Sequence, residues 1–197
     1  MKAMVIEEIG PVSEGREPLV LRDLPDPSPK PHEVLLEVLA CGVCHTELDE
    51  IEGRTPPAEL PMVPGHEVIG RVIGAGDQAD RFEEGDRVGV AWIFWADETC
   101  EFCRRGEENL CESFMATGRD ANGGYAEKMT VPESFAYPIP ETFTDVEAAP
   151  LLCAGAVGYR SLKLTELKDG QRLGLTGFGA SGHLVLQMAK HKFPQSD

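Results

Sequence analysis

Basic residues are scarce in this sequence of 197 residues: 18 Lys and Arg stand against 34 Asp and Glu, and the formal net charge is −16. Nucleic-acid affinity depends on Lys and Arg displacing counterions, so the composition argues against a nucleic-acid partner. No run of 18 or more apolar residues exists, which argues against a membrane-spanning helix. Residues 1–8 include acidic side chains at positions where a secretion signal needs an apolar stretch. We therefore expect a cytoplasmic protein without nucleic-acid or membrane partners.

Aromatic residues make up only 7% of the chain, but the hydrophobic fraction of 42% is enough for a packed core and argues against disorder. The length fits one full domain of about 100 to 150 residues and part of a second. Six cysteines are present. Because disulfides are rare in the cytoplasm, we expect these cysteines to be free thiols or metal ligands.

The first half of the chain alternates short runs rich in Val, Ile and Leu with Gly and Pro, a pattern that predicts strands. These runs are 33–39, 67–73, 86–92 and 125–131. Regular short strands with turn signals between them predict a β-barrel or sandwich. The pattern changes near residue 145, where a helical turn at 145–150 and a helix at 151–164 are predicted. We place a domain boundary near residue 150.

The last part of the chain predicts a strand at 171–176, a glycine-rich turn and a helix from about 183 to 192. A strand, such a turn and a helix open a dinucleotide-binding unit, which needs further parallel strands. We therefore expect residues 151–197 to form an incomplete second domain. In such a unit the three glycines permit the tight turn, the approach of the backbone to a pyrophosphate and close helix–strand packing, and here they are Gly177, Gly179 and Gly182.

One cluster of cysteines has the spacing of a metal site. Cys100, Cys103 and Cys111 follow Asp97 in the pattern Asp-x2-Cys-x2-Cys-x7-Cys. A Cys-x2-Cys turn directs two thiolates at one ion, and a loop returns further donors, so the four residues supply a tetrahedral zinc site. No position is left for a substrate, and the metal is predicted to be structural. The alternative is three unliganded thiols in a surface loop, exposed to oxidation.

Three further candidates are scattered along the chain and carry little weight singly. Cys153 alone is more often a small buried hydrophobic residue, and His66 alone is more often a hydrogen-bonded structural histidine. Cys44 belongs to Cys-Gly-Val-Cys-His-Thr at 41–46, which follows a predicted strand.

The motifs together resemble one family. They are Cys-Gly-Val-Cys-His-Thr at 41–46, Pro-Gly-His-Glu at 64–67, Gly-Asp-Arg-Val at 85–88, the cysteine loop 97–111, Leu-Leu-Cys-Ala-Gly at 151–155 and the glycine turn. Their order and spacing, along essentially the whole chain, resemble the zinc-dependent medium-chain alcohol dehydrogenases.

The resemblance implies a fold and cofactors. Residues 1–150 are expected to form a β-rich GroES-like barrel of the α+β class, the catalytic domain, with a structural zinc in the loop 97–111. Residues 151–197 are expected to hold a linking helix and the first βα unit of a truncated α/β Rossmann domain. The resemblance further implies two zinc ions per chain, NAD or NADP as cofactor, and a small alcohol or aldehyde as substrate. For the full-length protein of roughly 340 residues it implies a homodimer or homotetramer.

The resemblance also implies residue roles. Cys44, His66 and Cys153 are expected to bind the catalytic zinc, with a fourth position open to water or alcohol. Glu67 corresponds to an acid beside the metal. Thr46 corresponds to the hydroxyl that takes the alcohol proton; the alternative for Thr46 is a helix N-cap.

Other positions carry roles or depart from the family pattern. His45 corresponds to a pyrophosphate contact, with a solvent-facing loop histidine as the alternative. Trp92 corresponds to a substrate-pocket position, with core packing as the alternative. Asp97 replaces a cysteine, and Glu47 replaces an aspartate that orients the zinc histidine. Asp49 replaces the last histidine of the proton relay, and we hypothesise that Asp49 or water passes the proton on.

Two other interpretations of the sequence stay open. One is a catalytically inert zinc-binding fragment that acts only as a folding or interaction module, because a single βα unit leaves an apolar face and a strand edge uncovered. The other is a zinc-independent quinone-type reductase of the same superfamily. The presence of Cys44, His66 and Cys153 together disfavours this second interpretation.

Overall fold

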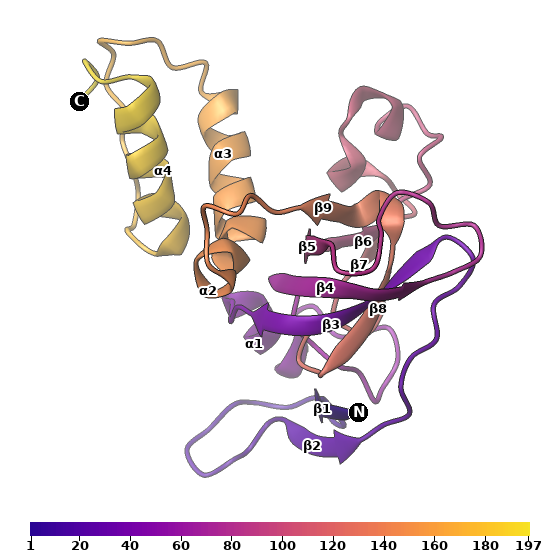
Figure 1. Cartoon of the computed structure of the whole chain (residues 1–197). Helices are drawn as coiled ribbons and strands as arrows, with labels where there is room; N and C mark the ends of the chain where they lie inside the picture. Colours follow the sequence, from indigo (N-terminus) through magenta and orange to yellow (C-terminus); the bar gives the residue numbers. More distant parts are fainter.

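A computed structural model describes all residues, 1–197. Its central element is a five-stranded antiparallel sheet with the strand order β8-β3-β4-β5-β9 (Figure 1). Each of the four predicted runs overlaps one of these strands. The strands are β3 (Glu33–Cys41), β4 (Val68–Ala75), β5 (Arg87–Val90), β8 (Lys128–Pro132) and β9 (Ala136–Pro138).

The sheet curls around a single main core. Val34 and Leu36 on β3 are fully buried, whereas Glu37 is exposed, which is the alternation expected of a strand with one inner face. The pairing of β3 with β4 shifts register twice, and such irregularities bend a strand and increase its twist. The resulting half-barrel confirms the predicted β-rich fold.

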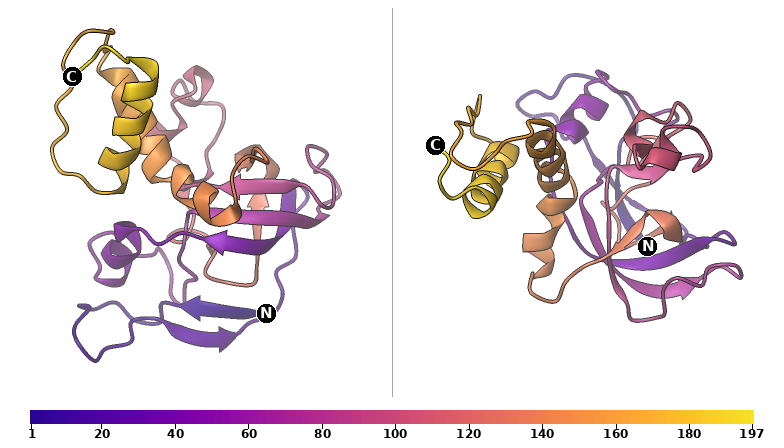
Figure 2. Two further views of the ribbon diagram at one scale, coloured as in Figure 1. Left: turned by 60° about the vertical axis from the view of Figure 1, so that its left-hand side comes forward. Right: turned by 90° about the horizontal axis from the view of Figure 1, so that it is seen from above.

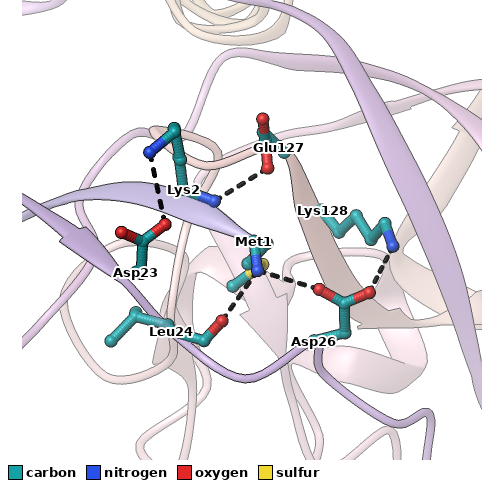
Figure 3. A network of polar contacts seen from close by, with 7 residues as sticks. All are labelled: Met1, Lys2, Asp23, Leu24, Asp26, Glu127 and Lys128. Carbon is teal, nitrogen blue, oxygen red and sulfur yellow. Dashed lines mark hydrogen bonds and ion pairs between the residues drawn. The ribbon is translucent and has the colours of Figure 1, made fainter.

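Two short ribbons flank the sheet. They are β1 (Lys2–Val5) with β2 (Val20–Asp23), and β6 (Ile93–Trp95) with β7 (Met115–Ala116). A polar network fastens the first ribbon to its surroundings (Figure 3). In this network the amino group of Met1 donates to the carbonyl oxygen of Leu24 at 2.7 Å and lies 3.0 Å from Oδ1 of Asp26. Lys128 of β8 pairs with the other oxygen of Asp26.

Four α-helices accompany the sheet: α1 (His45–Ile51), α2 (Asp145–Ala148), α3 (Ala154–Leu164) and α4 (Ala180–Lys192). The predicted helical turn at 145–150 is α2. The predicted helix at 151–164 begins later, because Ala149–Leu152 form a 3₁₀ turn that includes Pro150. The predicted helix at 183–192 begins earlier, at Ala180. No helix combines the length and the apolar character needed to cross a bilayer.

Helices α3 and α4 lie side by side, away from the sheet (Figures 1 and 2). Leu162 of α3 packs against Val185 and Ala189 of α4. Gly158 lies at the contact, where an added Cβ would come within 2.8 Å of Val185, so the absence of a side chain allows the helices to approach.

The predicted strand at 171–176 is wrong as a regular element, because no strand is present there. Apart from a local turn bond from the N–H of Gln171 to the carbonyl oxygen of Lys168, two backbone hydrogen bonds form, from the N–H of Leu173 to the carbonyl oxygen of Asp197 at 2.8 Å and from the N–H of Asp197 to that of Gln171 at 3.2 Å. A strand is defined by its ladder with a neighbour, and this segment pairs with a single residue.

Candidate metal centres and an apolar cleft

The first candidate centre begins where β3 runs into α1. Cys44 is the N-cap residue of α1, and its N–H donates to Oε2 of Glu47 at 2.7 Å. Glu47 therefore closes the first turn and holds Cys44 at the helix start. Thr46 lies inside the helix, so the alternative of Thr46 as N-cap is wrong.

Four side chains from three separate segments meet at this point. One donor atom each from Cys44, His66, Glu67 and Cys153 lies within 4.8 Å of the others. The two sulfur atoms are 3.7 Å apart. Two thiolates bound to one tetrahedral zinc ion at about 2.3 Å stand roughly 3.8 Å apart. The donor types and this spacing fit zinc.

His66 is oriented by a buried carboxylate. Its side chain is 1% exposed, and Nδ1 lies 2.7 Å from Oε1 of Glu47. This contact leaves Nε2 for the cluster, as a carboxylate partner does for metal-binding histidines. The longer side chain of Glu47 therefore still reaches the histidine. The preceding Gly65 has φ of +101°, a conformation that glycine adopts without strain.

Burial opposes the ionisation of two of these donors, Cys153 and Glu67. Burial, followed by the neighbouring Cys44, raises the pKa of the Cys153 thiol well above its usual range. Burial likewise raises the pKa of the Glu67 carboxyl. Because thiolates are the metal-binding form, the cluster is suited to a cation that stabilises the ionised sulfur atoms.

The second candidate centre is the loop of Asp97, Cys100, Cys103 and Cys111, whose donor atoms also lie within 4.8 Å of one another. Oδ1 of Asp97 accepts hydrogen bonds from the N–H groups of Thr99 and Cys100, each at 2.8 Å. Its Oδ2 is not engaged by these bonds. Burial, with Cys100 and Cys111 close by, raises the pKa of Cys103 to about 12. Four donors without an open position match a structural site.

An apolar cleft of about 710 Å³ opens beside the first centre. Thr46, His66 and Cys153 are on its wall, and Thr46 Oγ1 lies 3.5 Å from Sγ of Cys44. Trp92 also lines the cleft, and its ring meets that of His66 edge-on at 5.0 Å between centroids. Most of the remaining wall is apolar and comes from β6, the 3₁₀ turn 149–152 and α3, including Ile93, Leu152, Ala156, Val157 and Leu164.

Other predicted site residues lie outside the cleft. His45 is 75% exposed, and its Nε2 lies 3.8 Å from Oδ1 of Asp49. Asp49 also pairs with Arg54 at 2.5 Å, so the structure connects Asp49 to surface groups. Neither residue lines the cleft.

The three predicted glycines lie at the start of α4. Gly177 has φ of +80°, and Gly179 is the N-cap residue of α4. No atom would contact a Cβ at either position, whereas a Cβ on Gly182 would lie 3.1 Å from the carbonyl oxygen of Gly177. The turn thus has open space in front of the helix start, where backbone N–H groups are free.

The structure also shows residues that the sequence interpretation missed. Glu50 of α1 is fully buried with both carboxyl oxygens unpaired. Arg119 places its guanidinium over Trp92, with 5.5 Å between Cζ and the ring centroid. Neither residue belongs to a spacing motif, because the burial of Glu50 and the position of Arg119 over Trp92 arise only in the folded protein.

Comparison with known proteins identifies the family. The sequence profile described as "Alcohol dehydrogenase GroES-like domain" matches residues 30–141, more than half of the chain. The chain therefore belongs to this family, as the motif pattern predicted.

Individual relatives agree with this. The chain is 48% identical over 194 residues to the "Probable alcohol dehydrogenase AdhA" of Mycobacterium tuberculosis, covering 96% of this chain and 56% of the relative. Among solved structures, the cobalt- and zinc-bound thermostable alcohol dehydrogenase from Pyrobaculum aerophilum has a TM-score of 0.86 at 27% identity, covering 98% of this chain and 57% of that chain. The CAD from Helicobacter pylori complexed with NADP(H) has a TM-score of 0.86 at 25% identity, covering 100% and 57%. The chain spans about half the length of the curated relatives it matches.

Proposed function

We propose that the protein is a zinc-dependent alcohol dehydrogenase that transfers hydride between a primary or secondary alcohol, or the corresponding aldehyde or ketone, and NAD or NADP. The observation that carries the proposal is the cluster of Cys44, His66 and Cys153 on the wall of an apolar cleft. Three protein donors with free space beside them are the arrangement of a catalytic rather than a structural zinc site.

Cys44, His66 and Cys153 would hold the catalytic zinc, with Glu67 beside them. A zinc ion bound there supplies a Lewis acid that lowers the pKa of an alcohol. Glu47 fixes the ring of His66 and so directs Nε2 toward the cluster. Asp97 and the three cysteines of the loop 97–111 would hold a second, structural zinc.

Thr46 is the proposed proton carrier. Its hydroxyl lies on the cleft wall beside Cys44, where it can accept a proton from an alcohol and pass it on. Asp49 lies at the surface on the same helix, and we keep it as the group that exchanges this proton with water. Trp92 and the apolar residues of α3 would pack against the body of the substrate and exclude water from it.

The glycine turn is the proposed cofactor site. Gly177, Gly179 and Gly182 would let the pyrophosphate of NAD or NADP approach the start of α4, where free N–H groups and the helix dipole favour an anion. His45 would contact the same pyrophosphate. In this arrangement residues 1–150 are the catalytic domain, and residues 151–197 are the linking helix and the start of the dinucleotide-binding domain.

The remaining parts of the proposal concern the whole protein. We propose a small alcohol or aldehyde as the substrate, a homodimer or homotetramer as the assembly, and the cytoplasm as the location. Medium-sized apolar alcohols suit the cleft, because its wall is mainly hydrocarbon.

Zinc analysis combined with cysteine variants tests the proposal. We expect the unmodified protein to bind two zinc ions per chain. Cys153→Ala should lose one zinc ion and all alcohol oxidation, whereas the matched control Cys41→Ala should keep both zinc ions. Cys41 is a half-buried thiol whose pKa is raised to about 12 by burial and which lies outside both clusters. Two bound zinc ions without NADH binding or alcohol oxidation would instead identify a zinc-binding module without catalytic activity.

A further inference from the structure

A turn at 116–121 is fastened to the backbone beside Trp92. The N–H of Thr117 donates to the carbonyl oxygen of Trp92 at 2.9 Å, and its hydroxyl donates to that of Ala91 at 2.8 Å. Gly118 has φ of +84°, and its N–H donates to the carbonyl oxygen of Ala121 at 2.7 Å. The side chain of the next residue, Arg119, therefore starts from a fixed point close to Trp92.

The guanidinium of Arg119 is held from several directions. Its Cζ lies 5.5 Å from the ring centroid of Trp92 and 5.3 Å from that of Phe114. Nη2 donates to Oδ2 of Asp120 at 2.7 Å, and Nε lies within 3.2 Å of both oxygens. The same Asp120 accepts from the N–H of Ala116 at 2.8 Å, so the anchor of the guanidinium is itself fixed.

These contacts form a continuous connection to the candidate catalytic centre. Asp120 holds Arg119, the guanidinium lies over Trp92, and the Trp92 ring meets the ring of His66 at 5.0 Å. His66 in turn contacts Glu47 at 2.7 Å. Trp92 is thus confined by a charged group as well as by the proposed metal ligand.

We propose that Arg119 is a positioning residue that fixes Trp92 as the wall of the cleft and thereby determines how tightly an aromatic or other bulky alcohol binds; this inference rests on the proposed function. Arg119 does not line the cleft, so it acts through Trp92. A guanidinium suits this role because it is planar, keeps its charge and can stack on an aromatic ring while a carboxylate binds its edge. A lysine keeps the charge but loses the two-point contact with Asp120.

The position of Trp92 can be followed directly by NMR, because the chain has two tryptophans and each gives one indole N–H signal. The variant Trp95→Phe assigns the signals. We expect Arg119→Met to shift the Trp92 signal and Arg119→Lys to shift it less. The matched control is Arg81→Met, which removes a guanidinium 5.1 Å from the ring of Phe82 and should leave the Trp92 signal unchanged.

Titration of zinc-loaded protein with benzyl alcohol then tests the functional part. We expect the Trp92 signal to follow binding, and the dissociation constant to rise about fivefold in Arg119→Met, because a Trp92 ring that is no longer held has to be immobilised when the alcohol binds. Zinc content and thermal midpoint measured on each variant separate this effect from unfolding, and Arg119→Lys serves if Arg119→Met does not fold.

An unchanged Trp92 signal in folded Arg119→Met, or an unchanged dissociation constant, would overturn the role of Arg119 while the proposed function stands. Absence of benzyl alcohol binding by the unmodified, zinc-loaded protein would overturn the substrate role of Arg119, whereas the proposed function is overturned separately by absence of zinc binding or of alcohol oxidation. In that case a shift of the Trp92 signal in Arg119→Met would show a packing contact alone.

Discussion

The buried carboxyl of Glu50 predicts a stability that falls as the pH rises. Glu50 has no exposed surface, and neither of its oxygens has a hydrogen-bond partner. Burial first, and then the charge of Glu47, raise its pKa from 4.5 to about 8; Asp49 and Asp120 act in the same direction, and Arg119 acts against them. The folded protein therefore binds a proton that the unfolded chain releases between these two pH values.

The sign and size of the effect follow from this difference. Because the pKa is higher in the folded state, stability is fully present below about pH 4.5 and declines as the pH rises toward about 8. Each pH unit in this window lowers the free energy of unfolding by about 1.4 kcal/mol. Over the whole window the loss of stability is therefore at most near 5 kcal/mol. The protein relaxes around a charged Glu50, and Arg119 partly offsets the charge, so we expect an actual loss of about 2 to 3 kcal/mol in the free energy of unfolding.

The variant Glu50→Gln removes the ionisation while keeping the shape of the side chain. We expect it to show no such decline, so that its advantage over the unmodified protein grows by about 2 to 3 kcal/mol between pH 5 and pH 8.5. In thermal unfolding this corresponds to a relative rise of the midpoint by roughly 5 to 10 °C. Urea denaturation followed by circular dichroism, at equal zinc loading for both proteins, measures the difference.

The control is Glu59→Gln, which changes an exposed carboxylate and should follow the unmodified protein at every pH. Parallel pH profiles for Glu50→Gln and the unmodified protein would refute the reasoning. Such a result would mean that Glu50 is ionised in the folded state and is compensated by Arg119 or by water.

Two further predictions concern the candidate metal centres. Gly65→Ala should lower the free energy of unfolding by about 2 to 4 kcal/mol in urea denaturation. The reason is that φ is +101° and that the new Cβ would lie 2.6 Å from the ring of Tyr125. An unchanged stability would show that the loop before His66 can rearrange to accommodate a side chain without cost. Asp97→Asn keeps an oxygen for the N–H of Cys100 but removes the anionic donor, and should release one zinc ion per chain to a chelating dye much faster than the unmodified protein does. An unchanged release rate would exclude Asp97 as a ligand.

Several features of this protein follow from the sequence because they depend on neighbours along the chain. Short runs rich in Val, Leu and Ile predict the strands. A capping pattern that begins at Thr144 marks the start of α2. The cysteine loop is equally local, since Asp97 and Cys111 are few residues apart and a chain reversal alone brings the donors together. The order of the motifs also identified the family, and through it the donors that chain spacing does not connect.

The tertiary structure decided what depends on distant contacts. Cys44 and Cys153 are 109 positions apart, and only the tertiary fold, which brings the start of α1 close to the start of α3, places their sulfur atoms 3.7 Å apart. The segment 171–176 is not a regular strand, because β structure requires a partner that no local pattern supplies. The burial of Glu50 and the position of Arg119 over Trp92 likewise arise from packing between segments that are remote in sequence. Local chemistry thus determined which donors and strands exist, while packing determined how they are oriented and which charges are buried.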